Sequence, residues 1–170
     1  MLEFLNEVVR YLEGLADANQ RLLAALKEYQ DLLVSGKPEA IEKATPHVDR
    51  LTGEIRLLDE ERRAFVDGYF LKMGWDGPRN FSALASRVMS CGVNDDEAAA
   101  FERANRARSS LIRALAEVDA QNSLNLTLIG QSMSFADISL RALLGCRDKP
   151  PTYGPSQSDD EGPSLLDRQA

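Results

Sequence analysis

The sequence has few of the residues that most often carry out chemistry in small proteins. It contains two cysteines and one histidine, His47. Cys91 and Cys146 lie far apart without a CxxC partner, which argues against a zinc site and a disulfide framework. His47 has no nearby serine or cysteine nucleophile to activate, and there is no glycine-rich phosphate loop. We therefore expect no catalytic residue, no metal site and no cofactor, in a protein that is not an enzyme.

Aromatic and β-branched residues are also scarce. Aromatic residues make up 6% of the 170 residues, and 17 Val, Ile and Thr stand against 24 Leu and 20 Ala. Leucine and alanine lose little side-chain freedom in a helix, so this composition favours an all-α chain. The hydrophobic fraction of 44% is enough for a core and excludes wholesale disorder.

Basic residues are outnumbered by acidic ones. The chain holds 20 Lys and Arg against 27 Asp and Glu, a net charge of -7. A negative surface repels phosphate backbones and anionic lipids, which argues against nucleic-acid and membrane-surface binding. The first residues include acids where a secretory signal needs bases, and no apolar run reaches the roughly 18 to 20 residues that span a bilayer. We expect a soluble, cytoplasmic protein without membrane insertion.

What the sequence does contain is a long helical periodicity. In the first segment, apolar residues recur in steps of three and four, as in a heptad repeat. This seam consists of Leu5, Val8, Leu12, Leu15, Asn19, Leu22, Leu26, Tyr29 and Leu33. Similar spacing further along predicts helices over about 2–34, 38–73, 80–90 and 95–145. Gly36 should end the first helix, and Asn94 or Asp95 should cap the last. Because the turn at Ser35-Gly36 is short, the first two helices should form an antiparallel hairpin.

Two residues of the second helix break its pattern. Pro46 lies inside the helix and predicts either a kink or a restart with Thr45 as the N-cap. Arg62 occupies a seam position, where we expect its head to reach solvent or to meet an acid across the bundle.

The last predicted helix, residues 95–145, becomes more apolar after about residue 122. Its first seam runs through Phe101, Ala104, Arg108, Leu111, Leu115, Val118, Asn122, Asn125 and Ile129. A second apolar stripe then begins, so the segment 124–144 is apolar on more than one face. If this helix lies beside the first with an offset of about 90 residues, the end of the first helix meets it near residue 125. The following residues would then extend past the hairpin or fold back.

Soluble proteins rarely expose an apolar segment of this size unless it is an interaction surface. Our hypothesis is that residues 124–144 bind a partner helix. Two alternatives stay open: the helix bends near Gly130 and packs back on the hairpin, or two copies bury the segment in a homodimer.

The asparagines on the seams allow two interpretations. Asn19, Asn122 and Asn125 could form polar layers that set helix register, or they could grip the backbone of a partner.

The chain end differs from the rest. Residues 147–170 hold four of the seven prolines and the acidic run Asp159-Asp160-Glu161. Such a segment buries too little to offset its ordering entropy. We therefore predict a helical bundle domain over 1–146 and a flexible, disordered tail over 147–170.

The order of several motifs resembles the FlgN family of flagellar export chaperones. These motifs are the Asn122-x-x-Asn125 pair before the leucine-rich end of the last helix, and Thr152-Tyr153-Gly154 in the tail. The long heptad helix, the Ser-Gly turn and the segment Leu57–Arg63 agree with this resemblance, which spans nearly the whole chain.

The resemblance implies a cytoplasmic type III export chaperone of the hook-associated (hook–filament junction) proteins. Such a chaperone binds the C-terminal helical segments of its clients, prevents their premature assembly and delivers them to the export gate. By position, Tyr153 is the candidate contact with the cytoplasmic domain of the gate. The candidate client-binding residues are Asn122, Leu124, Asn125, Leu128, Ile129, Met133, Phe135, Ile138, Leu140 and Leu144. The alternative is a structural coiled-coil adaptor that dimerises without an export role, and the oligomeric state, monomer or homodimer, stays open.

Overall fold

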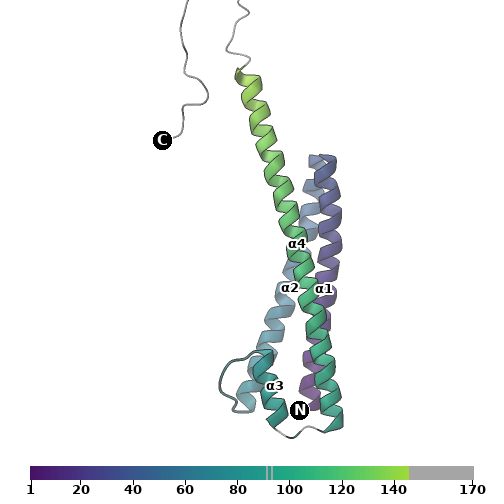
Figure 1. Cartoon of the computed structure of the whole chain (residues 1–170), viewed down its shortest axis with the longest axis vertical. Coiled ribbons are helices and arrows are strands. Elements are labelled where there is room, and N and C mark those ends of the chain that lie inside the picture. The colour runs from purple at the N-terminus through teal and green to yellow at the C-terminus, as the bar shows by residue number, and fades with distance from the viewer. Residues whose placement is uncertain (91, 93, 146–170) are drawn as a thin grey trace, which may run out of the picture. The chain divides into compact units, whose positions relative to one another are not determined.

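The computed structural model describes residues 1–90, 92 and 94–145. Within these residues the secondary structure is entirely helical (Figure 1), and its elements are α1 (Leu2–Ser35), α2 (Pro38–Lys72), α3 (Phe81–Ser90) and α4 (Asp95–Gly145). The predicted fold class, all-α with a long hairpin and a third long helix, is confirmed. Met1–Gln131 forms one compact unit and Ser132–Ala170 belongs to a second. The predicted tail, residues 147–170, lies outside the described residues.

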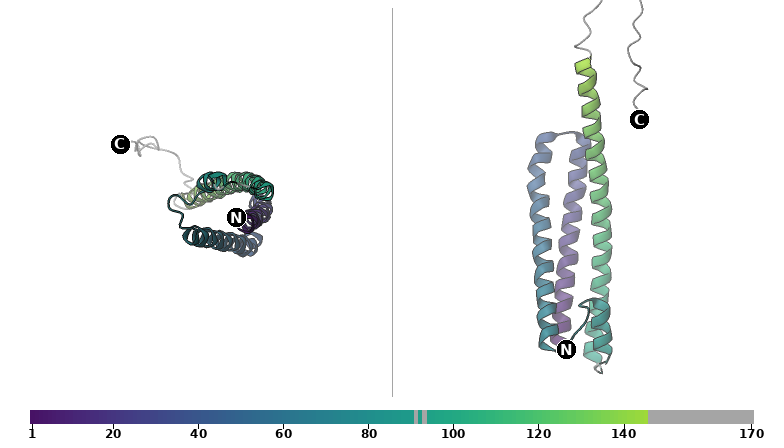
Figure 2. Two further views of the ribbon diagram at one scale, coloured as in Figure 1. Left: turned by 90° about the horizontal axis from the view of Figure 1, so that it is seen from below. Right: turned by 90° about the vertical axis from the view of Figure 1, so that its left-hand side faces the viewer.

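A tight turn makes the α1–α2 hairpin. Gly36 has a φ of 63°, a left-handed conformation, and its N–H donates to the Leu33 carbonyl at 3.2 Å. Glycine adopts this conformation without steric cost, as predicted for this position. Pro38 then opens α2, where its missing N–H removes no helical hydrogen bond. The helix α2 returns antiparallel along α1 (Figure 2).

The helix α2 passes through Pro46 without interruption. It is one helix from Pro38 to Lys72, so of the two predicted outcomes, a kink or a restart at Thr45, the restart is wrong. The Thr45 hydroxyl donates to the Ile41 carbonyl of its own helix at 2.9 Å instead of capping a new one. Pro46 is exposed, while Val48 and Leu51 beside it pack into a cluster with residues of α1. This packing stabilises the helical conformation of α2 at Pro46, where proline has no N–H and one backbone hydrogen bond is missing.

The helix α1 is the centre of the unit Met1–Gln131. Thirteen residues of α1 are buried, whereas only Leu51 and Phe70 of α2 are. The helix α2 and the part of α4 up to Gln131 lie on either side of α1 (Figure 2). As a result α1 is covered from two directions, and α2 is covered from one.

Aromatic side chains close the end of this unit where α3 lies. The ring of Phe4 stacks on Tyr69 with centroids 3.7 Å apart, and Phe81 stacks on Phe101 at 5.5 Å. Leu84 of α3 is buried in the same cluster. The Phe4–Tyr69 pair joins α1 to α2, and the contacts of Phe81 and Leu84 hold the short helix α3 against this cluster and the start of α4.

The start of α4 is capped as predicted. The Asn94 side-chain oxygen accepts the Glu97 N–H at 2.9 Å, and the Glu97 carboxylate accepts the Asn94 N–H at 3.4 Å. This reciprocal pair is a capping box, which satisfies donors that the first helical turn leaves free.

The buried stripe of α4 differs from the predicted seam. Arg108, Leu115 and Asn122 were expected in the seam, but all three are exposed. The buried positions of α4 are Ala100, Phe101, Ala104, Ala107, Ala114 and Asn125. Because alanine is small, a stripe of alanines lets two helix backbones approach closely. Leu111 packs half-buried beside this stripe, whereas Leu115 is exposed.

Candidate functional site

The candidate site is the end of α4, residues 124–144, which we call the distal stretch. It is helical throughout, and α4 is unbroken through Gly130. Thr127 donates to the Ser123 carbonyl at 2.9 Å, and Arg141 forms an ion pair with Asp137 at 2.9 Å. Both pairs span four residues of one helix and stabilise it locally.

A buried polar layer aligns α4 with α1 at the beginning of this stretch. The Asn125 amide donates to the Leu26 carbonyl at 2.9 Å, and Asn125 is only 2% exposed. The Gln121 amide donates to the Gln30 side-chain oxygen at 2.7 Å and to that of Asn125 at 3.3 Å. For Asn125, these contacts match the register-setting interpretation. The sequence pattern missed Gln121 and Gln30, although Gln121 stands one helical turn before Asn125.

The other two asparagines have different surroundings. Asn19 is buried, but its amide donates to the Leu15 carbonyl of its own helix at 2.8 Å, so it does not set register between helices. Asn122 is exposed on α4. The three asparagines therefore do not form one kind of site.

The cross-helix pairs measure the offset between α1 and α4. Residues that bond across the two helices are separated by 91 to 99 positions in the chain. The predicted offset of about 90 is close to the lower end of this range. Contact with α1 therefore continues slightly past Asn125, and Leu128 and Ile129 are half-buried.

The remaining candidates of the distal stretch are largely exposed. Their exposed fractions are 45% for Leu124, 68% for Met133, 73% for Phe135, 66% for Ile138, 56% for Leu140 and 52% for Leu144. Leu126 and Leu143, which were not among the candidates, are also exposed. Large apolar side chains in such a series form a patch of the kind that marks interaction surfaces.

The exposed apolar side chains of the distal stretch lie on two opposite faces of α4. At about 100° per residue, Phe135 and Ile138 share one face, while Met133 and Leu140 share the opposite one. Between Ser132 and Leu144 the sequence has two charged residues, Asp137 and Arg141, and they pair with each other. The surface is therefore apolar on two sides and carries no net charge.

Other candidate chemistry is sparse in the described part of the chain. His47 is exposed, and its Nδ1 lies 3.0 Å from the Arg50 guanidinium. The described residues contain no group of three or more side chains arranged to bind a metal. None of the described helices has the length and apolar character needed to cross a membrane. Tyr153 lies outside the described residues.

The fold and the site together define an all-helical protein whose notable surface is apolar rather than catalytic. Comparison with protein families identifies it further: the model of the FlgN family, described as FlgN protein, matches residues 1–161. The chain belongs to the FlgN family, which is a family of flagellar export chaperones and not of enzymes. Among curated proteins and among solved structures, none matches this chain.

Proposed function

We propose that this protein is a cytoplasmic chaperone of the hook-associated proteins of the hook–filament junction. It binds their C-terminal helical segments, prevents their premature assembly and delivers them to the flagellar export gate. The observation that carries this proposal is the exposure of the large apolar side chains on the distal stretch. Family membership gives the general role, and the distal stretch gives a surface able to perform it.

Binding at this surface would be driven by burial of apolar area. Each large apolar side chain contributes about 1.5–3 kcal/mol when it passes from full exposure to full burial. A client helix that tends to form coiled coils offers a matching apolar stripe, which the chaperone covers reversibly. Because the distal stretch is apolar on two opposite faces, it can accept helices from two sides.

The candidate residues divide into two roles in this proposal. Leu124, Met133, Phe135, Ile138, Leu140 and Leu144 contact the client directly, and Asn122 lies beside them on the exposed surface. Leu128 and Ile129 contribute the half of their side chains that remains exposed. Asn125 acts indirectly, because its amide is bonded to α1 and fixes where the stretch begins.

The competing function is a structural adaptor. In that case the same apolar faces pair with a second copy of the chain, and no client is captured. The two functions predict different masses and different effects of surface charges.

The test introduces charge on one face of the distal stretch. We expect Phe135→Asp combined with Ile138→Asp to weaken binding to the C-terminal fragment of a hook-associated protein at least about 100-fold, because a carboxylate in an apolar interface is unpaired. Binding is measured by calorimetry with the purified full chain. Ser132→Asp, at an exposed polar position of the same segment, adds charge without removing apolar surface and should bind normally.

Helicity and mass decide between the two functions. The chaperone function requires that the double variant keep its helical circular dichroism and the mass of the unaltered protein. If the charges instead split a dimer, as seen by light scattering, while the client fragment never bound, the adaptor function is correct.

A further inference from the structure

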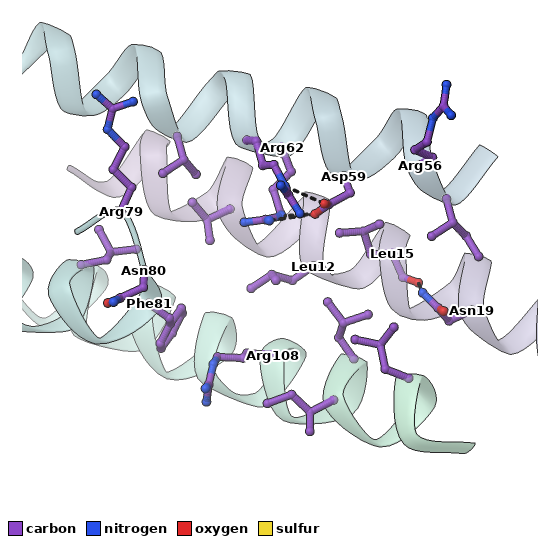
Figure 3. A pocket seen from close by; sticks show the side chains of 18 of the residues that line it. Leu12, Leu15, Asn19, Arg56, Asp59, Arg62, Arg79, Asn80, Phe81 and Arg108 are labelled. Carbon is purple, nitrogen blue, oxygen red and sulfur yellow. Dashed lines mark hydrogen bonds and ion pairs between the residues drawn. The ribbon is translucent and has the colours of Figure 1, made fainter. Parts of the chain in front are cut away.

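A second, unassigned surface lies between α2 and α4. There a groove of about 700 Å³ opens over α1. Leu12 and Leu15 of α1 form its floor, and Phe81, at the start of α3, closes one end (Figure 3). We call it the α2–α4 groove. All its lining residues precede Ala116 in the chain, so it is separate from the distal stretch.

The walls of this groove carry apolar side chains that the chain itself does not cover. Ile112 is 48% exposed and Leu115 is 47% exposed, although both face the groove from α4. On the opposite wall, Ile55 and Val66 of α2 are half-buried. These half-buried residues are one reason why α2 has so few buried positions: they face the groove and not another described helix. A helix laid in the groove would contact α1, α2 and α4 at once.

The rim of the groove is basic. Its lining includes five arginines and one acid, Asp59. The arginines are Arg56, Arg62, Arg63, Arg79 and Arg108. This is unusual for a chain with a net charge of -7.

Intramolecular pairing does not neutralise these arginines. Arg62 and Arg63 share the single carboxylate of Asp59, each at 2.7 Å. Arg62 therefore pairs with an acid of its own helix, so of the two alternatives expected for it, an acid across the bundle is wrong. Partial burial tends to raise the pKa of Asp59, but the hydrogen bonds and charge of Arg62 and Arg63 lower the pKa below its ordinary value. The carboxylate of Asp59 is therefore ionised, and its single negative charge faces two arginines.

The other rim arginines leave a positive excess. Arg56 pairs with Glu60 at 3.3 Å and Arg79 with Asp67 at 3.0 Å. Arg108 lies 5.3 Å from the centre of the Phe81 ring and makes no ion pair within the described residues. Five guanidinium groups therefore face three carboxylates, an excess of two positive charges.

We propose that the α2–α4 groove binds an amphipathic helix of a partner protein, with an apolar stripe flanked by Asp and Glu. The apolar floor accepts the stripe, and the basic rim selects the acidic flanks. A nucleic acid would not bury its backbone against a leucine floor, and a basic helix would be repelled by the rim. This is a binding site of different chemistry from the uncharged distal stretch.

The probe is a synthetic helical peptide of about three heptads with leucine on one stripe and glutamate on both flanks. Its binding to the full chain is followed by fluorescence anisotropy. We expect the glutamate peptide to bind at least about tenfold more tightly than the same peptide with lysine flanks, and the difference to shrink as salt rises from about 0.1 M to about 1 M.

Variants locate the binding to the groove. Arg108→Glu and, separately, Leu115→Gln should each weaken the glutamate peptide at least about fivefold. Arg106→Glu is the matched control, because Arg106 is exposed on the same helix but does not line the groove. Circular dichroism and urea unfolding show that each variant is folded. Phe135→Asp should leave this binding unchanged, so the groove and the proposed client site can succeed or fail separately.

Three results would overturn the proposal. The first is equal binding of the lysine and glutamate peptides. The second is normal binding by both folded groove variants. The third is competition by a peptide of residues 146–170, which holds five acidic residues against three basic ones. If that peptide bound the groove more tightly than the probe, the occupant would be the chain's own end and not a partner.

Discussion

At the scale of single residues, Asn125 joins two long helices that share few polar contacts. Its amide crosses from α4 to α1, where it meets the Leu26 carbonyl, and Gln121 extends the layer to Gln30. Both buried polar side chains of the described chain, Asn19 and Asn125, have hydrogen-bond partners. A polar group in an apolar seam lowers the stability of incorrect alignments more than that of the correct one, because only the correct alignment satisfies it.

Removing this amide should destabilise the protein. We expect Asn125→Ala to lower the free energy of unfolding by about 1–3 kcal/mol, because buried partners lose their hydrogen bond and a small cavity opens. Urea unfolding monitored by circular dichroism measures this loss. Asn122→Ala, at the exposed position of the same sequence motif, should change stability by less than about 0.5 kcal/mol. Equal losses from the two variants would show that burial of Asn125 does not matter.

At the scale of helices, α2 tolerates a proline because its neighbours pack. Pro46 is exposed, and the half-buried Val48 and buried Leu51 beside it belong to a cluster with Leu22 and Leu26 of α1. Local propensity alone favours a break at proline, since one hydrogen bond is lost and the ring crowds the preceding turn. Contacts with another helix outweigh this preference, which is why the restart expected at Thr45 does not occur.

The proline should nevertheless weaken α2. We expect Pro46→Ala to raise the free energy of unfolding by about 1–3 kcal/mol, because alanine restores a backbone donor and the best helix propensity. Part of the gain is offset, since proline also restricts the unfolded chain. The midpoint and slope of urea unfolding report the change, with Lys43→Ala at an exposed position of the same helix as the reference. A lower midpoint for Pro46→Ala would mean that the proline fits α2 better than alanine does.

At the scale of the whole molecule, the proposed client contact and the proposed gate contact lie in different segments. The client contact is on helix α4, in the distal stretch, and the gate contact is Tyr153, beyond the described residues. Separate segments allow a chaperone to hold its client and engage the export gate at the same time. A single aromatic anchor gives modest affinity, which suits a contact that must also be released.

This arrangement predicts that gate binding and client binding can be separated. Tyr153→Ala should weaken binding to the cytoplasmic domain of the export gate at least about tenfold and leave client affinity unchanged. Surface plasmon resonance with the full chain measures both. Tyr153→Phe keeps the ring and should retain most of the gate affinity. Identical gate affinity for Tyr153→Ala and the unaltered chain would remove Tyr153 from the contact.

The predictable part of the fold followed from local patterns. Steps of three and four residues, together with Gly36 and Asn94, place the ends of the helices within one residue of where the structure has them. The exposure of Met133, Phe135 and Ile138 also agrees with the surplus of apolar residues noted along the last helix. These features depend on residues near one another in the chain, which a sequence shows directly.

Which residues of α4 are buried could not be predicted from the sequence, because burial depends on which helices pack together. By itself, the sequence determined an all-helical chain, its helix boundaries and an apolar segment larger than one helix face. Only the tertiary structure decided that the buried face of α4 is mostly alanine and that Leu115 lies outside it. Because α4 turns this face toward the core, Ile112 and Leu115 stay exposed and Arg108 lies at the rim of the α2–α4 groove. The physical reason is that periodicity identifies a helix with apolar faces, whereas the choice among those faces depends on how closely two backbones can approach.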